Sequence, residues 1–595
     1  MAGRSRSTAM LAHASTSFAT LAVLACMASA AYLSPDAFDT IYLPATPEEK
    51  IAQTWTLSEA GSSIDGIKNL LAHNNILGNG IATLTDPPAN LTSGPGLQYL
   101  ATAVQAYLAL YGGVSLVVPG IFYFWPSNTN SFYHGATTYV PGGAVDFNGG
   151  AVYSKAFTTL KDGPLLLTTP PFEYDNIWTV NFYDVYGQVY HTIGKQHGSN
   201  GGAKIYIVPP GWDGELPDPE FELVRSPTIE GILLGRTLVG GNNSAVKPFN
   251  LAWTLEVYDN PDAEGLPEAI RFAYPETSLT AGDWQTPEDP LIFWKLVGEV
   301  YRRNGAWHIE DPLKRLLPTL GLWEEYGFVQ ASVSPLALDA LKIAPYYANR
   351  ILTAKWINLG PKERGYWQNP WNLGSYGVDY VNLAAQQKFW NIPNKQTDAV
   401  YYWGFVDSDG VPYTGANGTE YDIEFASAPP VNDYSFWSIV ANRHPDVLLG
   451  APPLPGSPPG QPAWSSIYKD AYSNNGTWRF RLSATPPPAN TTAASRGWNW
   501  VSLPPGTFYL TLRLYSPGAA PLADTYIPPP VVRVKGGGAS PTPTPAPTPA
   551  PTPAPTPAPT PAPTPVPTPA PTPAASGNTS VAGPSPAAGR RLRQR

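Results

Sequence analysis

Cysteine is nearly absent from this chain. The 595 residues contain one, Cys26, within the first thirty residues. Those thirty residues carry Arg4 and Arg6, then the apolar run LAVLA, then Ala28-Ser29-Ala30, which is the order of a secretory signal peptide cleaved after Ala30. The mature protein would have no thiol, so cysteine nucleophiles, thiolate metal sites and disulfides are excluded. We therefore expect a secreted, extracellular protein that is stabilised by its hydrophobic cores.

A long uninterrupted apolar run is also missing. The best candidate, residues 100–125, is broken by Gln105, by the Gly112-Gly113 pair and by Pro119. A membrane span needs about 20 consecutive apolar residues, which this segment does not supply. Its first half predicts a buried helix, and its β-branched second half, from Val114 onward, predicts a buried strand. We expect no stable membrane span.

Positive charge is scarce in the body of the chain. The formal charge is −9, but six of the basic residues are arginines in the first thirty residues or at the extreme C-terminus. Without them, 30 basic residues face 45 acidic ones, a formal charge of −15 on residues 31–535. Such a body would repel phosphate backbones, so nucleic acid is not an expected partner.

The common catalytic and cofactor motifs are absent. The chain has no G-x-S-x-G elbow, no H-E-x-x-H, no P-loop and no dinucleotide fingerprint. The six histidines of the mature chain show no metal-ligand spacing, and the stretch 407–410, DSDG, predicts a hairpin turn better than a calcium loop. We expect no metal and no cofactor, and the sequence names no catalytic residue.

Several segments are typical of β-strands and helices. Residues 148–275 hold short alternating segments with turn clusters, which predict an antiparallel β-sandwich. Residues 276–398 are helical in pattern, with Phe293, Leu296, Val297 and Val300 at helical intervals, and strands return over 399–535. The predicted fold class is multidomain α+β and mainly β, with two antiparallel β-sandwich domains joined by a helical region. Residues 31–147 form an N-terminal helical entry region after the signal peptide, 1–30.

The C-terminal residues 536–595 predict a tail without a fold of its own. Every second residue is proline from Pro541 to Pro573, alternating with threonine, alanine or one valine. Proline fixes φ and removes the amide donor, so we expect a disordered polyproline II rod of about 100 Å. A plain spacer is one interpretation. The repeat also resembles the stalks of hydroxyproline-rich glycoproteins of plant-type and green-algal cell walls, and the expected extracellular location favours that interpretation.

The body resembles two known families. The segments DGPLLLTTPP, IWTVNFYDVYG, KIYIVPPGWDGELP and ELVRSPT are similar to the successive motifs of the domain of unknown function 1254. The later YYWGFVDSDGVPYTG, FASAPPVNDYSFWSI and FYLTLRLYSP are similar to its companion, the domain of unknown function 1214. The resemblance covers roughly residues 100–534 and implies two β-sandwiches linked by a helical region, with no settled activity. Where the family tends to have Asp and Thr, this chain has Gly150 and Ala151, although Asn148 and Tyr153 remain.

Residues 174–194 predict a β-hairpin with two unlike faces. Asp184 and Gly187 suit the ends of a β-turn, which predicts a pairing in which partner numbers sum to 371. The polar face either meets a ligand or is covered by another part of the chain. His191 falls on the apolar face, where it is better explained as a hydrogen-bonded core histidine than as a catalytic one. The apolar face would carry Trp178, Val180, Phe182, Val189, His191 and Ile193, and the polar face Thr179, Asn181, Tyr183, Gln188, Tyr190 and Thr192.

Two arginines lie in strand-like apolar surroundings, Arg225 and Arg236. A guanidinium in such a place needs acceptors, so each predicts either a structural ion pair or a ligand site for an anion or carboxylate. Together with Tyr153, Asn181 and Tyr183, these arginines form the candidate ligand-binding set. Convergence of the five residues in one pocket would favour an extracellular enzyme over a matrix protein.

Six N-x-Ser/Thr sequons follow the signal peptide and predict N-glycosylation on surface loops. With the expected secretion and the proline tail, they favour a glycosylated extracellular-matrix or cell-surface protein whose partners are cell-wall or matrix polysaccharides or glycoproteins. The alternative is an extracellular, hydrolase-like enzyme with a polar pocket between the sandwiches. The six sequon asparagines are Asn90, Asn242, Asn417, Asn475, Asn490 and Asn578.

Overall fold

The computed structural model divides the chain into two units, Met1–Gly537 and Gly538–Arg595. The described residues all belong to the first unit. The predicted signal peptide, the proline tail, Asn242, Asn417 and Asn578 lie outside them, and no described helix is both long and apolar enough to cross a membrane. The described residues are 88–92, 94–117, 129–135, 151–239, 245–258, 289–356, 367–369, 372–389, 392–416, 418–443, 463–467, 470–504, 506 and 508–535.

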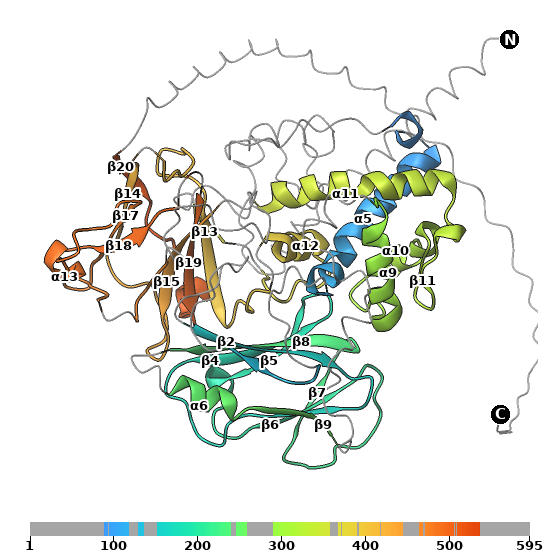
Figure 1. Ribbon diagram of the computed structural model, residues 1–595, viewed down its shortest axis with the longest axis horizontal. Helices are drawn as coiled ribbons and strands as arrows, with labels where there is room; N and C mark the ends of the chain where they lie inside the picture. The colour runs from blue at the N-terminus through green and yellow to red at the C-terminus, as the bar shows by residue number, and fades with distance from the viewer. Residues whose placement is uncertain are drawn as a thin grey trace, which may run out of the picture. The chain divides into compact units, whose positions relative to one another are not determined.

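The described chain is mainly β, with several sheets and eight helices. Two sheets form the first β region (Figure 1). The first sheet has the order β1-β2-β8-β4-β5 and the second has the order β7-β6-β3-β9. The strands of the first sheet are β1 Tyr133–His134, β2 Ala151–Thr159, β8 Glu230–Leu238, β4 Trp178–Asp184 and β5 Val189–Gly194. Those of the second are β7 Glu222–Arg225, β6 Lys204–Val208, β3 Leu165–Thr168 and β9 Thr254–Val257.

The two sheets share one buried apolar cluster. Trp178 and Phe182 contribute from the first sheet, and Ile205 and Leu165 contribute from the second. The short helix α6, Val246–Leu251, adds Phe249, whose ring packs against that of Trp178 at 5.4 Å. Alternate residues of β4 point into this cluster, as period-two strands require. The opposite face of the first sheet is therefore left to the helices and to the second β region.

The predicted antiparallel pairing is wrong at two places. β6 pairs with β7 in parallel, and β17 (Trp478–Ser483) pairs with β18 (Asn499–Ser502) in parallel. In both cases the connection is longer than a hairpin turn. A parallel pair needs a crossover of about a dozen residues, which both connections provide.

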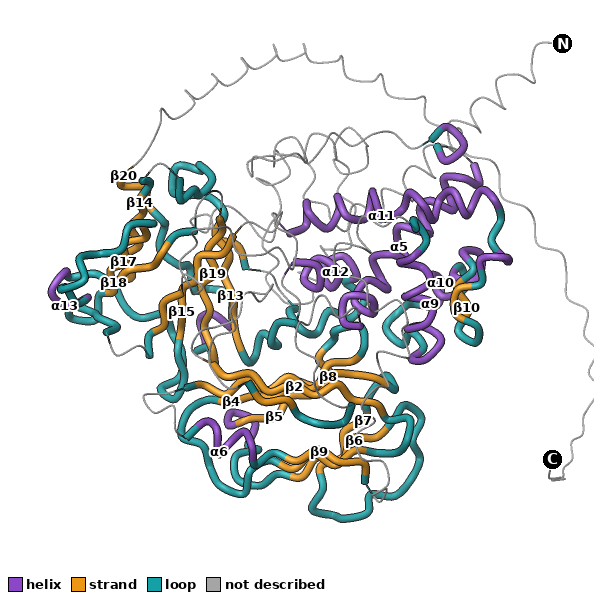
Figure 2. Tube along the Cα trace, viewed as in Figure 1, coloured by secondary structure: helices purple, strands orange, loops and turns teal. Residues whose placement is uncertain are grey.

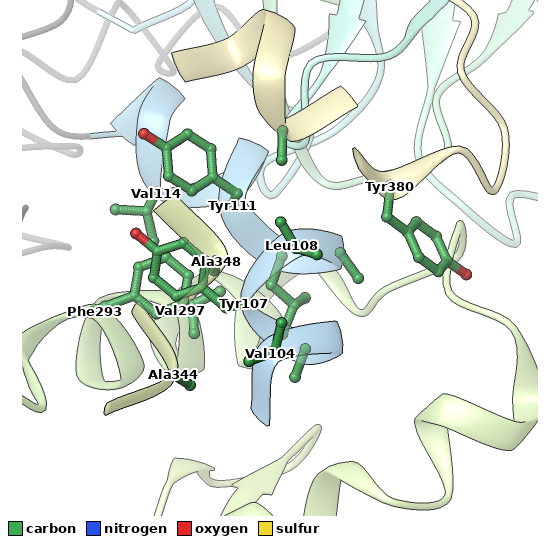
Figure 3. Packing of buried hydrophobic residues seen from close by; sticks show 14 of the residues in the cluster. Val104, Tyr107, Leu108, Tyr111, Val114, Phe293, Val297, Ala344, Ala348 and Tyr380 are labelled. Carbon is green, nitrogen blue, oxygen red and sulfur yellow. The ribbon is translucent and has the colours of Figure 1, made fainter. Parts of the chain in front are cut away.

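The helical spacing that the sequence predicts around Phe293 is confirmed. The spacing of Phe293, Leu296, Val297 and Val300 corresponds to helix α9, and all four side chains are buried. They join the largest apolar cluster of the described chain, part of which is drawn in Figure 3. The helices of this region are α9 Ile292–Asn304, α10 Asp311–Lys314, α11 Pro335–Trp356 and α12 Tyr380–Phe389, with the 3-10 turns η6 Leu317–Leu320 and η7 Gln330–Ser332 and the hairpin β10 Leu322–Trp323 and β11 Gly327–Phe328.

The first long helix, α5, runs over Gly94–Val117 after the turn η3, Ala89–Leu91. The predicted change to a strand at Val114 is wrong, because the helix continues through Gly112 and Gly113 to Val117; the rest of the predicted strand lies outside the described residues. A Cβ on Gly112 would lie 1.9 Å from the carbonyl oxygen of Tyr186. The glycine therefore lets the helix approach the β4–β5 turn closely, and this packing offsets the poor helix propensity of glycine.

The second β region has two sheets (Figure 2) and includes the short strand β12, which lies within the segment predicted to be helical. One sheet has the order β12-β13-β19-β15-β16 and the other has the order β18-β17-β14-β20. A second apolar cluster draws residues from both sheets, among them Tyr402, Leu512 and Phe480. The remaining strands are β12 Trp367–Gln368, β13 Ala399–Gly404, β19 Phe508–Tyr515, β15 Trp437–Arg443, β16 Ala463–Ser465, β14 Glu420–Phe425 and β20 Val532–Lys535, with helices α13 Ala493–Arg496 and α14 Ala519–Leu522.

The predicted turn of the β4–β5 hairpin is present, but the predicted register is wrong. The Gly187 amide donates to the Asp184 carbonyl at 3.0 Å, and Gly187 has φ +88°. The Asp184 amide also bonds to Gln188, so the loop has three residues, as in a type I turn followed by a left-handed glycine. The pairing then shifts again between Phe182 and Tyr183.

This shift changes the composition of the two faces. Phe182 lies opposite His191, not opposite Val189, and Tyr183 pairs with Val189. Val189 consequently belongs to the large apolar cluster that includes Tyr183 and the helices. Tyr190 packs on the other side, against the apolar cluster between the two sheets that includes Phe182. The extra residue of a β-bulge produces this inversion near the turn, whereas Asn181 and Tyr183 keep their predicted face.

Candidate functional site

Arg236 is the centre of a buried polar cluster on the face of the first sheet that lies away from the second sheet. Its guanidinium donates to Asn181 Oδ1 at 2.6 Å, to the Ile392 carbonyl at 2.7 Å and to the Tyr183 hydroxyl at 3.3 Å. The side chain is 8% exposed. All three of these acceptors are uncharged, so none of these three hydrogen bonds is an ion pair.

Tyr183 ties the same face to the segment before β13. Its hydroxyl bonds to the Pro393 carbonyl at 2.6 Å and lies 3.2 Å from the Ile392 carbonyl. The residue is fully buried, and this burial raises the pKa of the phenol above its ordinary value. A neutral phenol that bonds to backbone carbonyls holds two parts of the chain together and is poorly placed to act as a base.

Asn181 connects Arg236 with a buried carboxylate. Its amide nitrogen donates to Asp398 Oδ2 at 3.0 Å and to the Thr192 hydroxyl at 3.0 Å. Asp398 precedes β13 and is 1% exposed. Its other oxygen lies 2.7 Å from His197 Nε2, in the turn η4, Lys195–His197, and 2.6 Å from Gln196 Nε2. Asp398 is therefore fully held by side chains from the first β region.

Three members of the cluster are not predicted from the sequence: Asp398, His197 and the carbonyl of Ile392. One local feature pointed to Asp398: it directly precedes the apolar strand AVYYWG. A carboxylate that is buried beside such a strand must find hydrogen-bond partners. Nothing in the sequence joined that position to Asn181, 217 residues earlier. His197 was seen only as a histidine without a metal-ligand partner. The contact between them depends on tertiary structure alone.

Tyr153 lies next to this cluster and Arg225 does not. Tyr153 is the cross-strand partner of Arg236 between β2 and β8, and the two side chains share a face. Arg225 is exposed on β7, in the other sheet. Its guanidinium donates to the Trp212 carbonyl at 2.6 Å and lies over the Trp212 ring at 5.5 Å. Four of the five candidate residues thus come together, and Arg225 is excluded from the site.

His191 lies on the apolar face but does not pack as expected. Its ring contacts Phe182 edge-on at 5.1 Å, and its side chain keeps 24% of its surface exposed. Burial lowers the pKa of His191 to about 4, helped by Lys395 and His197. The ring is therefore neutral at pH 7, so the 3.2 Å approach of its Nε2 to Glu222 Oε1 is not an ion pair at that pH.

A second buried carboxylate lies at the hairpin turn. Asp184 accepts from the Tyr186 and Gln188 amides at 2.9 and 2.8 Å and from Trp307 Nε1 at 2.6 Å. Burial raises the pKa of Asp184 to about 6, although these three hydrogen bonds oppose the shift. The sequence identified Asp184 as a turn residue, but its contact with the helical region was not predictable.

Metal binding finds no support in the described part of the chain, where no group of three or more histidine, cysteine, aspartate or glutamate side chains could hold an ion. The stretch 407–410 is a hairpin turn, as predicted. Asp407 Oδ1 accepts from the Asp409 and Val411 amides, and Asp407 Oδ2 lies 2.8 Å from Arg533 Nε. These contacts use the carboxylate for the turn and for an ion pair.

The sequon asparagines that the structure describes are all exposed. Asn475 lies in a tight turn before β17 with φ +50°. Asn490 lies in the connection from β17 to β18, and Asn90 lies in η3, where its amide donates to Asp339 at 3.1 Å. Exposure is a condition for carrying a glycan, and these three positions meet it.

Comparison with known families gives two matches in tandem. Residues 129–251 match the family described as "Protein of unknown function (DUF1254)", and residues 398–519 match "Protein of unknown function (DUF1214)". The two matched segments follow one another along the chain. The DUF1254 segment contains Arg236, Asn181 and Tyr183, and the DUF1214 segment begins at Asp398. The buried polar cluster therefore lies where the two segments meet.

A solved structure of similar fold gives no activity. The VPA0106 protein from Vibrio parahaemolyticus aligns with 73% of this chain and 100% of its own, at 15% identity and a TM-score of 0.51. An uncharacterised protein from Burkholderia cenocepacia aligns with 82% of this chain and 99% of its own, at 13% identity and a TM-score of 0.37. The likeness to VPA0106 is one of fold alone. The search of curated proteins gives no match.

Proposed function

We propose that the protein is a secreted, glycosylated component of an extracellular matrix or cell surface. In this proposal the DUF1254 and DUF1214 segments are two β-sandwiches that form a rigid folded body, and residues 536–595 are a stalk that binds wall or matrix polymers. The observation that carries the proposal is that the residues expected to line a reactive pocket are largely occupied by the chain itself. Asn181, Tyr183 and Arg236 bond to Asp398 and to the carbonyls before β13.

Three further features support an extracellular role. The first thirty residues have the order of a signal peptide, and the tail from Pro541 to Pro573 has the composition of a glycosylated wall stalk. Asn90, Asn475 and Asn490 are exposed, as acceptors of glycans must be. Together these features fit a protein whose folded body is presented outside the cell.

The test is deletion of residues 536–595 in a walled cell that expresses the full-length protein. Because a polyproline II segment lacks the apolar surface to pack on a core, the truncated body should melt within about 2 °C of the full chain. The truncated protein should move from the wall fraction into the medium. A truncated protein that remained in the wall fraction would contradict the role of the stalk, and retention of the full chain inside the cell would contradict secretion.

A second candidate function is extracellular catalysis, and one contact favours it. His197 is 30% exposed and lies 2.7 Å from the buried Asp398, which is the arrangement that orients a general base. The test is turnover of a small ester, amide or glycoside by the purified body. Turnover that His197→Gln abolishes, without a change in melting temperature, would establish the enzyme. Equal rates in both proteins would assign any turnover to a contaminant.

A further inference from the structure

We infer that residues 305–310 form a strap that acid releases, with His308 as the group that takes up the proton. The strap connects α9 to α10 and is bonded to α5, to the β4–β5 turn and to α12. Its hydrogen bonds, the burial of His308 and the charges around this ring lead to the inference. The inference goes beyond the proposed extracellular role and does not depend on it.

The strap is bonded to the β4–β5 turn at two points. Trp307 Nε1 donates to Asp184 Oδ2 at 2.6 Å, and the Tyr186 hydroxyl donates to the Gly305 carbonyl. The strap and the turn are more than a hundred residues apart in the sequence, so both bonds are tertiary contacts. Release of the strap therefore breaks the contact between the helical region and the end of β4.

Tyr380 of α12 holds the other end of the strap. Its hydroxyl accepts from the Glu310 amide at 3.0 Å and donates to the His308 carbonyl at 3.3 Å. A backbone amide that is hydrogen-bonded exchanges its hydrogen only after the bond opens. Exchange at the Glu310 amide therefore reports whether the strap is bound to α12.

The ring of His308 can take up a proton at one atom only. Nε2 lies 2.8 Å from the Ala109 carbonyl of α5, and a carbonyl oxygen only accepts, so Nε2 carries the hydrogen of the neutral ring. Nδ1 is buried and has no hydrogen-bond partner among the described residues. The residue is 4% exposed. A proton on Nδ1 would create a buried charge and a donor without an acceptor, both of which the closed strap disfavours.

The charges around His308 do not compensate such a proton. Helix α5 contributes no charged side chain, and Lys314 of α10 repels a second positive charge. The Tyr186 ring, 4.3 Å away, offers a cation–π contact, which returns less than the burial of a charge costs. Burial, helped by Lys314, lowers the pKa of His308 to about 4. The remaining charged groups on the strap and on the elements packed against it are Asp184, Glu310, Asp311 and Lys388.

Asp184 does not supply the missing counter-charge. Burial raises the pKa of Asp184 to about 6, so its carboxyl group is already neutral at the pH at which His308 would be protonated. The closed strap favours the neutral form of both groups. Acid therefore favours opening through His308 and closing through Asp184, and the experiment has to separate the two.

The experiment compares hydrogen exchange in the full chain and in His308→Gln at pH 7.5 and 5.0. Glutamine keeps a donor for the Ala109 carbonyl and does not titrate. Mass spectrometry of the Ile309 and Glu310 amides, corrected for the intrinsic exchange rate, gives the opening constant of the strap. Because the pKa of His308 is about 4 in the closed strap and near 6.5 in the open one, the full chain should open about 25-fold more in acid, relative to the variant. An equal pH dependence in both proteins would overturn the inference.

A matched control histidine lies outside the strap. Burial also lowers the pKa of His191 to about 4, but His191 is on β5. In His191→Gln the strap should keep the pH dependence of the unmodified chain. Loss of that pH dependence would show that the opening extends beyond the strap and would contradict a local release.

Asp184→Asn provides a second test that does not require His308→Gln to fold. This variant removes the group that opposes the release, so its strap should open about 25-fold more at pH 5.0 than at pH 7.5. Absence of a rise would overturn the inference.

The backbone amides of β8 show whether the release is local. At pH 5.0, the Ile309 and Glu310 amides of the full chain should have opening constants at least about ten times those of β8, because β8 exchanges only when the first sheet unfolds. Equal opening constants would show that the strap opens only on global unfolding, and would overturn the inference.

Discussion

The two faces of the sheet β1-β2-β8-β4-β5 are both buried, but different interactions cover them. On one face, Trp178, Val180 and Phe182 pack into an apolar cluster with the second sheet of the DUF1254 segment. On the other, Asn181 and its neighbours reach the start of the DUF1214 segment through hydrogen bonds. Apolar contact is not directional, whereas hydrogen bonds fix distance and angle. The first face supplies most of the stability, and the second specifies how the two segments join.

The largest effect should come from the apolar face. Trp178→Ala removes a fully buried ring that packs against Phe249 and Trp253. The free energy of unfolding should fall by about 3–5 kcal/mol, because the cavity cannot collapse completely. Urea unfolding followed by fluorescence measures this change. Phe172→Ala, at a residue that is 46% exposed, is the control and should cost less than about 1 kcal/mol. Equal losses would contradict the assignment of the core.

The next largest effect should be a difference in the free energy of unfolding between variants of Arg236 and Arg225, two arginines with similar neighbours in the sequence. Arg236→Met should lower the free energy of unfolding by about 3 kcal/mol, because it leaves buried acceptors on Asn181 and Ile392 without donors. Arg225→Met should change it by less than about 0.5 kcal/mol, since Arg225 is exposed. Chemical denaturation of the two variants measures the contrast. A similar cost for both would mean that Arg236 is not buried in the polar cluster.

A smaller effect is the pH dependence of the free energy of unfolding that Asp184, at the end of β4, should produce. The pKa of Asp184 is about 6 in the folded chain and near 3.8 in the unfolded chain, so the native state binds the additional proton. Its contribution to stability is complete below about pH 3 and is lost as the pH rises through 6, with a loss of about 2.4 kcal/mol between pH 4 and pH 7. Asp184→Asn should remove this fall. Unfolding curves at pH 4, 5, 6 and 7 test it, and parallel pH profiles for both proteins would disprove the shift.

The sequence predicted most of the elements and part of the candidate site. Alternation placed Asn181 and Tyr183 on one face, and the helical spacing around Phe293 was correct, because both patterns are local. Tight packing of Gly112 against Tyr186 extended a helix that composition would end there, and a bulge changed the hairpin register. Arg225 and Arg236 have similar neighbours along the chain. Only the tertiary contacts of the sheet decide which one is buried.

The central claim is that Asn181 and Asp398 join the DUF1254 segment to the DUF1214 segment through a direct hydrogen bond. A double-mutant cycle with Asn181→Ala, Asp398→Ala and the double variant measures this bond as a coupling in the free energy of unfolding. A hydrogen bond to a buried carboxylate should give a coupling of about 1.5–3 kcal/mol. Losses that add within about 0.3 kcal/mol would show that the two side chains do not interact, and would contradict the account.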